Sequence, residues 1–492
     1  MAMGRRKSKQ RSMWLSGAKV ARGPRNVFYE KLNGQLSRVE FDRQVEGWCA
    51  PYYEEAGQPG RPSVPPGVYF RMLFIGYFEG IESERGIDWR CSDSLSLKEF
   101  LGYEPHEATP DHSTLSKTRK RLDSEVFEQV FTLVLGLVDK SGLLSGKTLG
   151  VDSTMLRADA SMKAIVRKET GEDYREYLRN LAIADGIEEP TAEDLRRMDR
   201  KRKGKKTSNK DWKSQTDPDA RIARLKDGRT RLAYKAEHVV DMETGAIVSA
   251  ELFPADAGDT ITMQDSLDTA KENIRDARRD DDDDDDSKPP NEGPPNAGGT
   301  AQDDEVIEVV ADKGYHKASL LRELRDQGYR TYIPERKQRG KRRWKRRKDG
   351  AAQKAAFHEN RRRVLRKKGR ALQRKRGEMV ERPNAHLYET GAHRRVRLRH
   401  HENVRKRLLL HAAAANLGRV MRKVTGAGTP RGFADRLRAA LLAAFALLAA
   451  LLGLTPLLTP RGRQLRPWSA GRRACGILPG QTPSRRLVQT AA

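Results

Sequence analysis

The chain has 492 residues, enough for two or three domains, and its 96 Lys and Arg against 68 Asp and Glu give a formal net charge of +28. Such a basic surface favours a polyanionic partner, with nucleic acid ahead of an anionic membrane surface. Three cysteines without a CxxC pair argue against a disulfide scaffold, a zinc ribbon or an iron–sulfur site, and they fit a reducing cytoplasm. No apolar run follows the basic N-terminus, so a secretory signal is not expected.

The N-terminal part of the chain is predicted to be basic and then helical. Residues 1–60 mix basic residues with Gly and Pro and show little periodicity, which indicates an extension. In residues 61–143 apolar side chains recur at spacings of three and four, which predicts a helical domain. Its segment TPDHSTLSKTRKRL offers capping residues and then a short basic helix, as in helix-turn-helix modules. An ordinary helical bundle with a solvated charged face is the alternative. The candidate DNA contacts here are Lys117, Arg119 and Lys120.

Strand-like segments begin after Gly146. The first is KTLGVDST, and a pair joined by Met-Glu-Thr-Gly, RLAYKAEHVVD and GAIVSAELF, predicts a hairpin. A helix opened by Asp259 comes next, followed by the strand VIEVVAD, a second helix and the strand RTYIPE. We therefore expect a second domain of strands and helices over residues 144–425, with insertions at about 157–211, 276–304 and 336–370.

Two of these insertions carry unusual charge runs. Seven consecutive aspartates, residues 280–286, lack the ligand spacing of a calcium loop and are interpreted as part of a surface insertion. The run RKQRGKRRWKRRKDG has ten Lys or Arg in fifteen residues with one Trp. It is either a solvated loop or a surface that contacts phosphates and stacks on a base, and we favour the second. Its candidate DNA contacts are Arg342, Arg343, Trp344 and Lys345.

The C-terminal tail, residues 426–492, contains one apolar segment, AALLAAFALLAALLGL. It is shorter than the roughly 20 residues that span a bilayer. We interpret it as a helix that packs on the protein or on a partner, with a membrane anchor as the alternative.

Two predicted strands end on a carboxylate, Asp152 in the first and Asp312 in VIEVVAD. Carboxylates brought to one sheet region suit a pair of Mg²⁺ ions, which lie about 3.5–4 Å apart in two-metal phosphoryl-transfer sites. Mg²⁺ prefers such hard oxygen ligands. A third carboxylate is needed, and spacing alone does not choose among Glu378, Glu381 and Glu402.

Several motifs resemble bacterial insertion-sequence transposases of the DDE class, over roughly residues 68–422. They are GVDSTMLRADASMKAIVRKETGEDY, TDPDAR, VVDMETGAIVSAELFPADAGD, VVADKGYH and VERPNAHLYETGAHRRVRLRHHENVRKRLLLHAAAANLGRVMR. The resemblance implies an α/β fold: a ribonuclease-H-like mixed sheet flanked by helices, preceded by an all-α DNA-binding domain. It also implies an acidic triad holding two Mg²⁺ ions, for which Mn²⁺ can substitute. The motifs place the triad on Asp152, Asp312 and Glu381.

The resemblance extends to residues around the triad. Lys313 and Tyr315 are candidates for contacting a phosphate, with a packed aromatic as the alternative for Tyr315. His238 is expected to be structural or to support a ligand. The basic side chains expected on the DNA backbone are Arg394, Arg395, Arg397 and Arg399.

Two further expectations concern residues outside the triad. His400 and His401 stand where the family usually has a glycine, so an altered local backbone is expected there. Asp217 and Asp219 are expected to cap or turn the chain just before the segment RLKDGRTRLAYK, which is expected to form a hairpin.

The expected function is that of a transposase. It would bind the terminal inverted repeats of its element in double-stranded DNA, hydrolyse the ends and join the 3′ hydroxyls to target DNA, as a homodimer on two ends. The expected location is the bacterial cytoplasm at the nucleoid, without a membrane. The alternatives are a nuclease that does not join DNA and a catalytically inactive, transposase-derived DNA-binding protein.

Overall fold

The computed structural model describes residues 3, 26–53, 63–202, 208–279, 306–337, 342, 344, 349–392 and 395–451. The aspartate run, the DNA-contact candidates Arg343, Lys345 and Arg394, and the tail after residue 451 lie outside these residues. The chain divides into two compact units, Met1–Arg436 and Leu437–Ala492.

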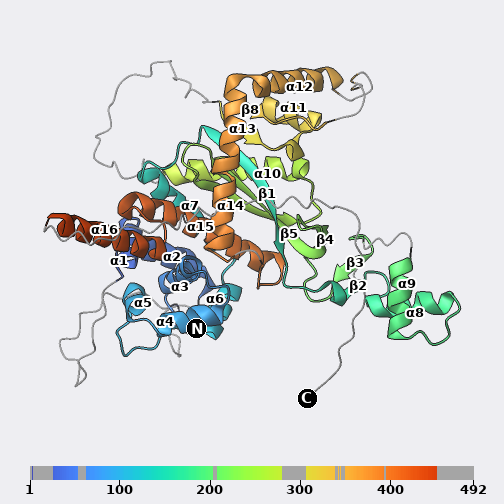
Figure 1. Ribbon diagram of the computed structural model, residues 1–492, viewed down its shortest axis with the longest axis horizontal. Coiled ribbons are helices and arrows are strands. Elements are labelled where there is room, and N and C mark those ends of the chain that lie inside the picture. The colour runs from blue at the N-terminus through green and yellow to red at the C-terminus, as the bar shows by residue number, and fades with distance from the viewer. Residues whose placement is uncertain are drawn as a thin grey trace. The chain divides into compact units, whose positions relative to one another are not determined.

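Among the described residues, seven α-helices precede the first strand (Figure 1). Two of them lie in residues 1–60, where periodicity predicted none, and they bury Phe28, Leu32 and Phe41. Side-chain oxygens of Ser83, Ser94 and Asp111 accept backbone N–H groups at the starts of three later helices. The helices are α1 (Val27–Arg38), α2 (Phe41–Cys49), α3 (Pro66–Glu79), α4 (Glu84–Ser92), α5 (Leu95–Leu101), α6 (His112–Arg121) and α7 (Ser124–Lys140).

A buried arginine joins the first three helices. Arg71 of α3 is 0% exposed, and its guanidinium donates to Asp42 Oδ1 at 2.5 Å and Oδ2 at 3.0 Å. Its Nε donates to Asn33 Oδ1 at 3.0 Å. Because a buried guanidinium must be matched by hydrogen-bonded acceptors, these contacts fix how α1 and α2 pack on α3.

The main sheet has six strands in the order β4-β5-β1-β7-β8, with β6 also paired to β5. Strand β1 is antiparallel to β5 and parallel to β7, which is parallel to β8. The sheet is therefore mixed, as the resemblance implied, and the predicted hairpin is present as β5 and β6. The strands are β1 (Thr148–Arg157), β4 (Arg221–Arg224), β5 (Thr230–Asp241), β6 (Ile247–Pro254), β7 (Glu308–Ala311) and β8 (Arg330–Tyr332).

Helices cover both faces of this sheet, so its central strands are buried (Figure 1). On one face, Ser153 of β1 contacts α10 through Asp259. On the other, a side chain at Gly150 would meet Val380, between α13 and α14, which explains why the strand has a glycine there. The helices that follow β6 are α10 (Asp259–Arg279), α11 (Ala318–Asp326), α12 (Gly350–Leu365), α13 (Lys367–Met379), α14 (Glu381–Glu389) and α15 (His401–Thr425).

The polar insertion after β1 has a small core of its own. Leu178, Ala182 and Leu195 pack together, and a capping box between Thr191 and Asp194 begins the second of its helices. Its elements are β2 (Ile165–Arg167), α8 (Tyr174–Ala184), α9 (Ala192–Lys201) and β3 (Trp212–Ser214).

The predicted apolar C-terminal segment forms much of α16 (Pro430–Leu451). Leu442, Phe445 and Leu451 on this helix are more than two-thirds exposed. Within the described residues, none of the helices combines the length and apolarity needed to cross a membrane.

The Arg71 contacts predict a sharp difference between two aspartates of the helical region. Asp42→Ala should lower the free energy of unfolding by about 3 kcal/mol, because it leaves a buried guanidinium without its carboxylate. Asp93→Ala, which alters an exposed aspartate at the end of α4, should change it by less than about 0.5 kcal/mol. Urea denaturation followed by circular dichroism measures both. Equal effects would contradict a structural role for the Arg71 pair.

Candidate active site

Parallel pairing brings two aspartates together at the centre of the sheet. The register of β1 and β7 runs from Thr148 opposite Glu308 to Val151 opposite Ala311. The next residues are Asp152 and Asp312, and Asp312 is still extended, with φ −78° and ψ 174°. In adjacent paired strands such positions lie about 4.8 Å apart. The two aspartates that the sequence singled out are thus neighbours, although β1 does not end at Asp152 but continues to Arg157.

The two carboxylates are held differently. Asp312 Oδ1 accepts the Gly314 N–H at 2.6 Å, which fixes it at the start of a short 3₁₀ turn. The carboxyl of Asp152 is largely buried, and this burial raises its pKa. Positive charge on Arg376 and Lys226 opposes that rise, and the nearby negative charge of Asp312 adds to it. Asp152 is therefore within the electrostatic field of Asp312.

Helix α13 lies across the ends of these strands. Gln373 Nε2 donates to the carbonyl oxygens of Ala311 at 3.3 Å and Tyr332 at 2.6 Å. Three residues further on, Arg376 Nη1 lies 3.9 Å from Asp152 Oδ1. The helix that leads to two of the third-carboxylate candidates is thus anchored over the aspartate pair.

The three candidates for the third carboxylate have different surroundings. Glu378 is exposed and pairs with Arg382 at 3.0 Å, and Glu402 pairs with Lys406. Glu381 is exposed and begins α14, and among the described residues it forms neither a hydrogen bond nor an ion pair. None of the three contacts Asp152 or Asp312 within the described part of the chain.

A charged network beneath the aspartates was missed by the sequence analysis, which assigned Asp259 only as the start of a helix. Asp259 Oδ1 accepts from Ser153 Oγ at 3.1 Å and lies 2.9 Å from Lys235 Nζ. A Cβ added to Gly314 would lie only 2.7 Å from Asp259 Oδ2 and 2.6 Å from Asp312 Oδ1, so both carboxylates lie close to this glycine. Asp259 therefore links the residue after Asp152 to the turn after Asp312.

The same network is closed by Glu237, which is 0% exposed, like Lys235. Glu237 accepts from the hydroxyls of Thr262 at 2.9 Å, Ser266 at 2.7 Å and Tyr315 at 2.8 Å. The signal that could have revealed it is Lys235 and Glu237, two ionisable residues at alternate positions in the middle of the long β5 strand.

Two aromatic candidates from the sequence are internal. Tyr315 is 1% exposed and donates to Glu237, and burial raises the pKa of its phenol. The packed-aromatic alternative is thus correct, and the phosphate contact is wrong. His238 lies opposite Asp152 in the β1–β5 ladder, and burial lowers its pKa to about 4, so the imidazole is neutral at pH 7.

The described DNA-contact candidates fall into two groups. Lys117, Lys120 and Lys313 are exposed. The others contact protein groups: Arg119 pairs with Glu84, Arg342 with Glu335, Arg395 and Arg399 with Asp159, Arg397 with Glu82, and Trp344 packs on Phe357.

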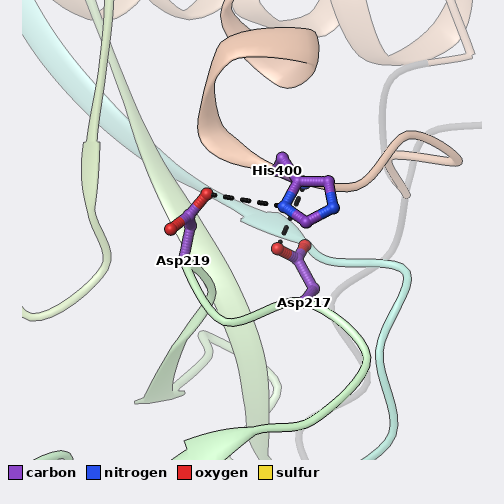
Figure 2. A group of neighbouring side chains, drawn as sticks. All are labelled: Asp217, Asp219 and His400. Carbon is purple, nitrogen blue, oxygen red and sulfur yellow. Dashed lines mark hydrogen bonds and ion pairs between the residues drawn. The ribbon is translucent and has the colours of Figure 1, made fainter.

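A second acidic group lies at the start of α15 (Figure 2). Asp217 Oδ1 accepts the His400 N–H at 3.2 Å, and Asp219 Oδ2 accepts the His401 N–H at 3.0 Å. The two aspartates thus accept backbone N–H groups at the start of α15 from a turn far away in the sequence, a contact that the sequence did not predict. His400 has φ +69° and ψ 140°, so a residue other than glycine adopts here a conformation that favours glycine.

Comparison with known proteins gave two family matches. The family described as Transposase domain (DUF772) matches residues 21–121, and the family described as Transposase DDE domain matches residues 201–417. Together they cover more than half of the chain; Asp312 and Glu381 lie within the second range, and Asp152 lies between the two. No curated protein and no solved structure matched the chain.

The backbone at His400 predicts a stabilising substitution. His400→Gly should raise the free energy of unfolding by about 1 kcal/mol, because glycine adopts this φ without strain. The measurement is made with a chelator present, so that no metal ion bound by the imidazole contributes to stability. His400→Ala keeps the Cβ and should give no such gain. Urea denaturation of both variants separates the backbone from the imidazole, and equal stabilisation by the two would contradict the backbone explanation.

Proposed function

Because the chain belongs to the DDE transposases of insertion sequences, we propose that it cleaves the ends of its element and joins them to new DNA. It would bind the terminal inverted repeats, hydrolyse one phosphodiester bond at each end and transfer the freed 3′ hydroxyls to a target. The observation that carries this proposal is the pairing of β1 with β7, which makes Asp152 and Asp312 neighbours. A homodimer holding two ends is part of the same proposal.

The residues present fit the divalent metal that the family uses. Asp152 and Asp312 offer hard carboxylate oxygens side by side, and each lies where a cation would relieve the repulsion between them. Bound Mg²⁺ would neutralise the scissile phosphate and lower the pKa of an attacking water or hydroxyl. Asp152 and Asp312 would hold it, and Arg376 supplies positive charge to Asp152 in its absence.

We propose Glu381 as the third carboxylate. Glu378 and Glu402 each form an ion pair one helical turn away, whereas Glu381 is unpaired among the described residues. Glu381 also follows Val380, where α13 ends and α14 begins, and Val380 packs against the strand that carries Asp152. A small change at this junction would direct Glu381 toward the aspartates when DNA binds.

The roles of the carboxylates can be tested with DNA that carries the element's own ends. In Mg²⁺, Asp152→Asn, Asp312→Asn and Glu381→Gln should each reduce end cleavage by at least about 100-fold, because each removes a charge that holds the metal. Glu378→Gln and Glu402→Gln, which alter paired glutamates, should retain it. A labelled duplex resolved on a denaturing gel measures cleavage, and a substrate with a free 3′ hydroxyl measures joining.

The outcomes of this assay separate the alternatives. Cleavage that survives Asp312→Asn would contradict the proposed site. Hydrolysis without joining by the unaltered protein would indicate a nuclease, and binding without cleavage would indicate an inactive DNA-binding protein. Loss of activity in Glu378→Gln, with Glu381→Gln active, would reassign the third carboxylate.

The helical region predicts which basic residues contact DNA. Lys117→Ala and Lys120→Ala should each weaken binding of the element ends and lower the slope of log affinity against log salt by about 1, as expected when one phosphate contact is lost. Lys271→Ala, an exposed lysine of α10, is the matched control and should leave the slope unchanged. Arg119→Ala should lower the melting temperature instead, because Arg119 pairs with Glu84. Fluorescence anisotropy over a salt series measures the slope, and unchanged slopes in both lysine variants would remove α6 from the DNA interface.

A further inference from the structure

Asp217, Asp219 and His400 bring three potential metal ligands to one place. One carboxylate oxygen from each aspartate and one imidazole nitrogen all lie within 4.8 Å of one another. Within the described part of the chain, no other three His, Cys, Asp or Glu residues meet this condition. Figure 2 shows both carboxylates beside the imidazole, from segments about 180 residues apart in the sequence.

Helix capping does not account for every oxygen in this group. Asp217 is 0% exposed, and its Oδ1 accepts both the Tyr234 hydroxyl at 2.7 Å and the His400 N–H. Its Oδ2 is buried and has no hydrogen-bond partner among the described residues. A buried carboxylate oxygen left unsatisfied carries a full desolvation cost, so a ligand that binds it would be strongly favoured.

The imidazole is placed to share such a ligand. His400 Nδ1 lies 3.9 Å from Asp219 Oδ2, which is too long for a hydrogen bond. Two ligands that each lie about 2.0–2.2 Å from one tetrahedral zinc ion are roughly 3.3–3.6 Å apart, so a small rotation of the exposed imidazole would bring the two atoms to that separation. Capping uses Oδ1 of Asp217, so Oδ2 remains free for a cation.

We propose that Asp217, Asp219 and His400 bind one divalent cation of the zinc type, with water completing a tetrahedral site. An imidazole nitrogen with two carboxylates suits Zn²⁺ better than Mg²⁺, which prefers oxygen ligands alone. The site is separate from the proposed catalytic carboxylates, so this inference goes beyond the proposed function and does not depend on it.

The cation would join two segments that also contact each other through two hydrogen bonds and a long ion pair. Asp217 and Asp219 precede β4, and His400 ends the basic segment that contains Arg395 and Arg399. Both arginines pair with Asp159. Fixing His400 would therefore fix the position of this basic segment against the sheet.

The test uses the full-length chain with Asp152→Asn and Asp312→Asn, which removes metal binding at the proposed catalytic site. Isothermal titration with ZnCl₂ should show one Zn²⁺ per chain, and Zn²⁺ should raise the melting temperature. Adding His400→Gly or Asp219→Asn should weaken the affinity roughly tenfold or more and abolish the thermal shift. His106→Gln, which alters an exposed histidine elsewhere, is the matched control and should bind as the parent does.

The variants keep the outcome clear. The Asp219→Asn variant retains a side-chain oxygen for the His401 N–H, and glycine relieves the backbone at residue 400, so neither change should unfold the chain. The proposal would be overturned if the parent did not bind Zn²⁺, or if the His400→Gly and Asp219→Asn variants bound it as tightly as the parent does. The two aspartates would then be helix caps only. Because cleavage is not measured, failure of the proposed function would not alter this result.

Discussion

The parallel pairing of β1 with β7 is the constraint on which the rest of the candidate active site depends. It aligns Asp152 with Asp312 across 159 intervening residues, including the helical insertion after β1 and the segment that follows α10. A parallel pair must be buried on both faces, because its strands are joined by crossover segments that cover the sheet. Helices α10 and α13 meet that requirement: α13 brings Arg376 to Asp152, and α10 brings Asp259 to Ser153, the next residue of β1.

The charged groups on the two faces of β1 are compensated to different degrees. On the face of Ser153, the charged groups of Lys235, Glu237 and Asp259 contact one another and four hydroxyls, so the ionisable groups form a closed and largely buried network. On the face of Asp152, the only cation in contact among the described residues is Arg376, at 3.9 Å. The closed network holds β1 and β5 in place on one face of the sheet. On the other face, the negative charge of Asp152 and Asp312 is only partly compensated, so the pair can bind a cation.

The sequence predicted what depends on local pattern. The hairpin of β5 and β6 and the starts of several helices follow from periodicity and capping, whereas β1 continues beyond the acidic residue on which it was expected to end. The sequence did not predict α1 and α2, because their buried faces are completed by Arg71 and other residues of α3. Nor could it show that Tyr315 points to Glu237, since that contact joins residues 78 positions apart.

The same limit applies to charge. A net charge of +28 indicates a polyanionic partner, but it does not say which cations are available to it. Arg119 and Arg395 were predicted to contact DNA, but each forms an ion pair within the fold. Arginine is suited to such forked internal contacts, whereas a flexible, strongly hydrated lysine loses more by burial. The exposed Lys117 and Lys120 of α6 are therefore better candidates for phosphate contact than Arg119 between them. Arg119 and Arg395 are better understood as holding their own segments in place within the fold.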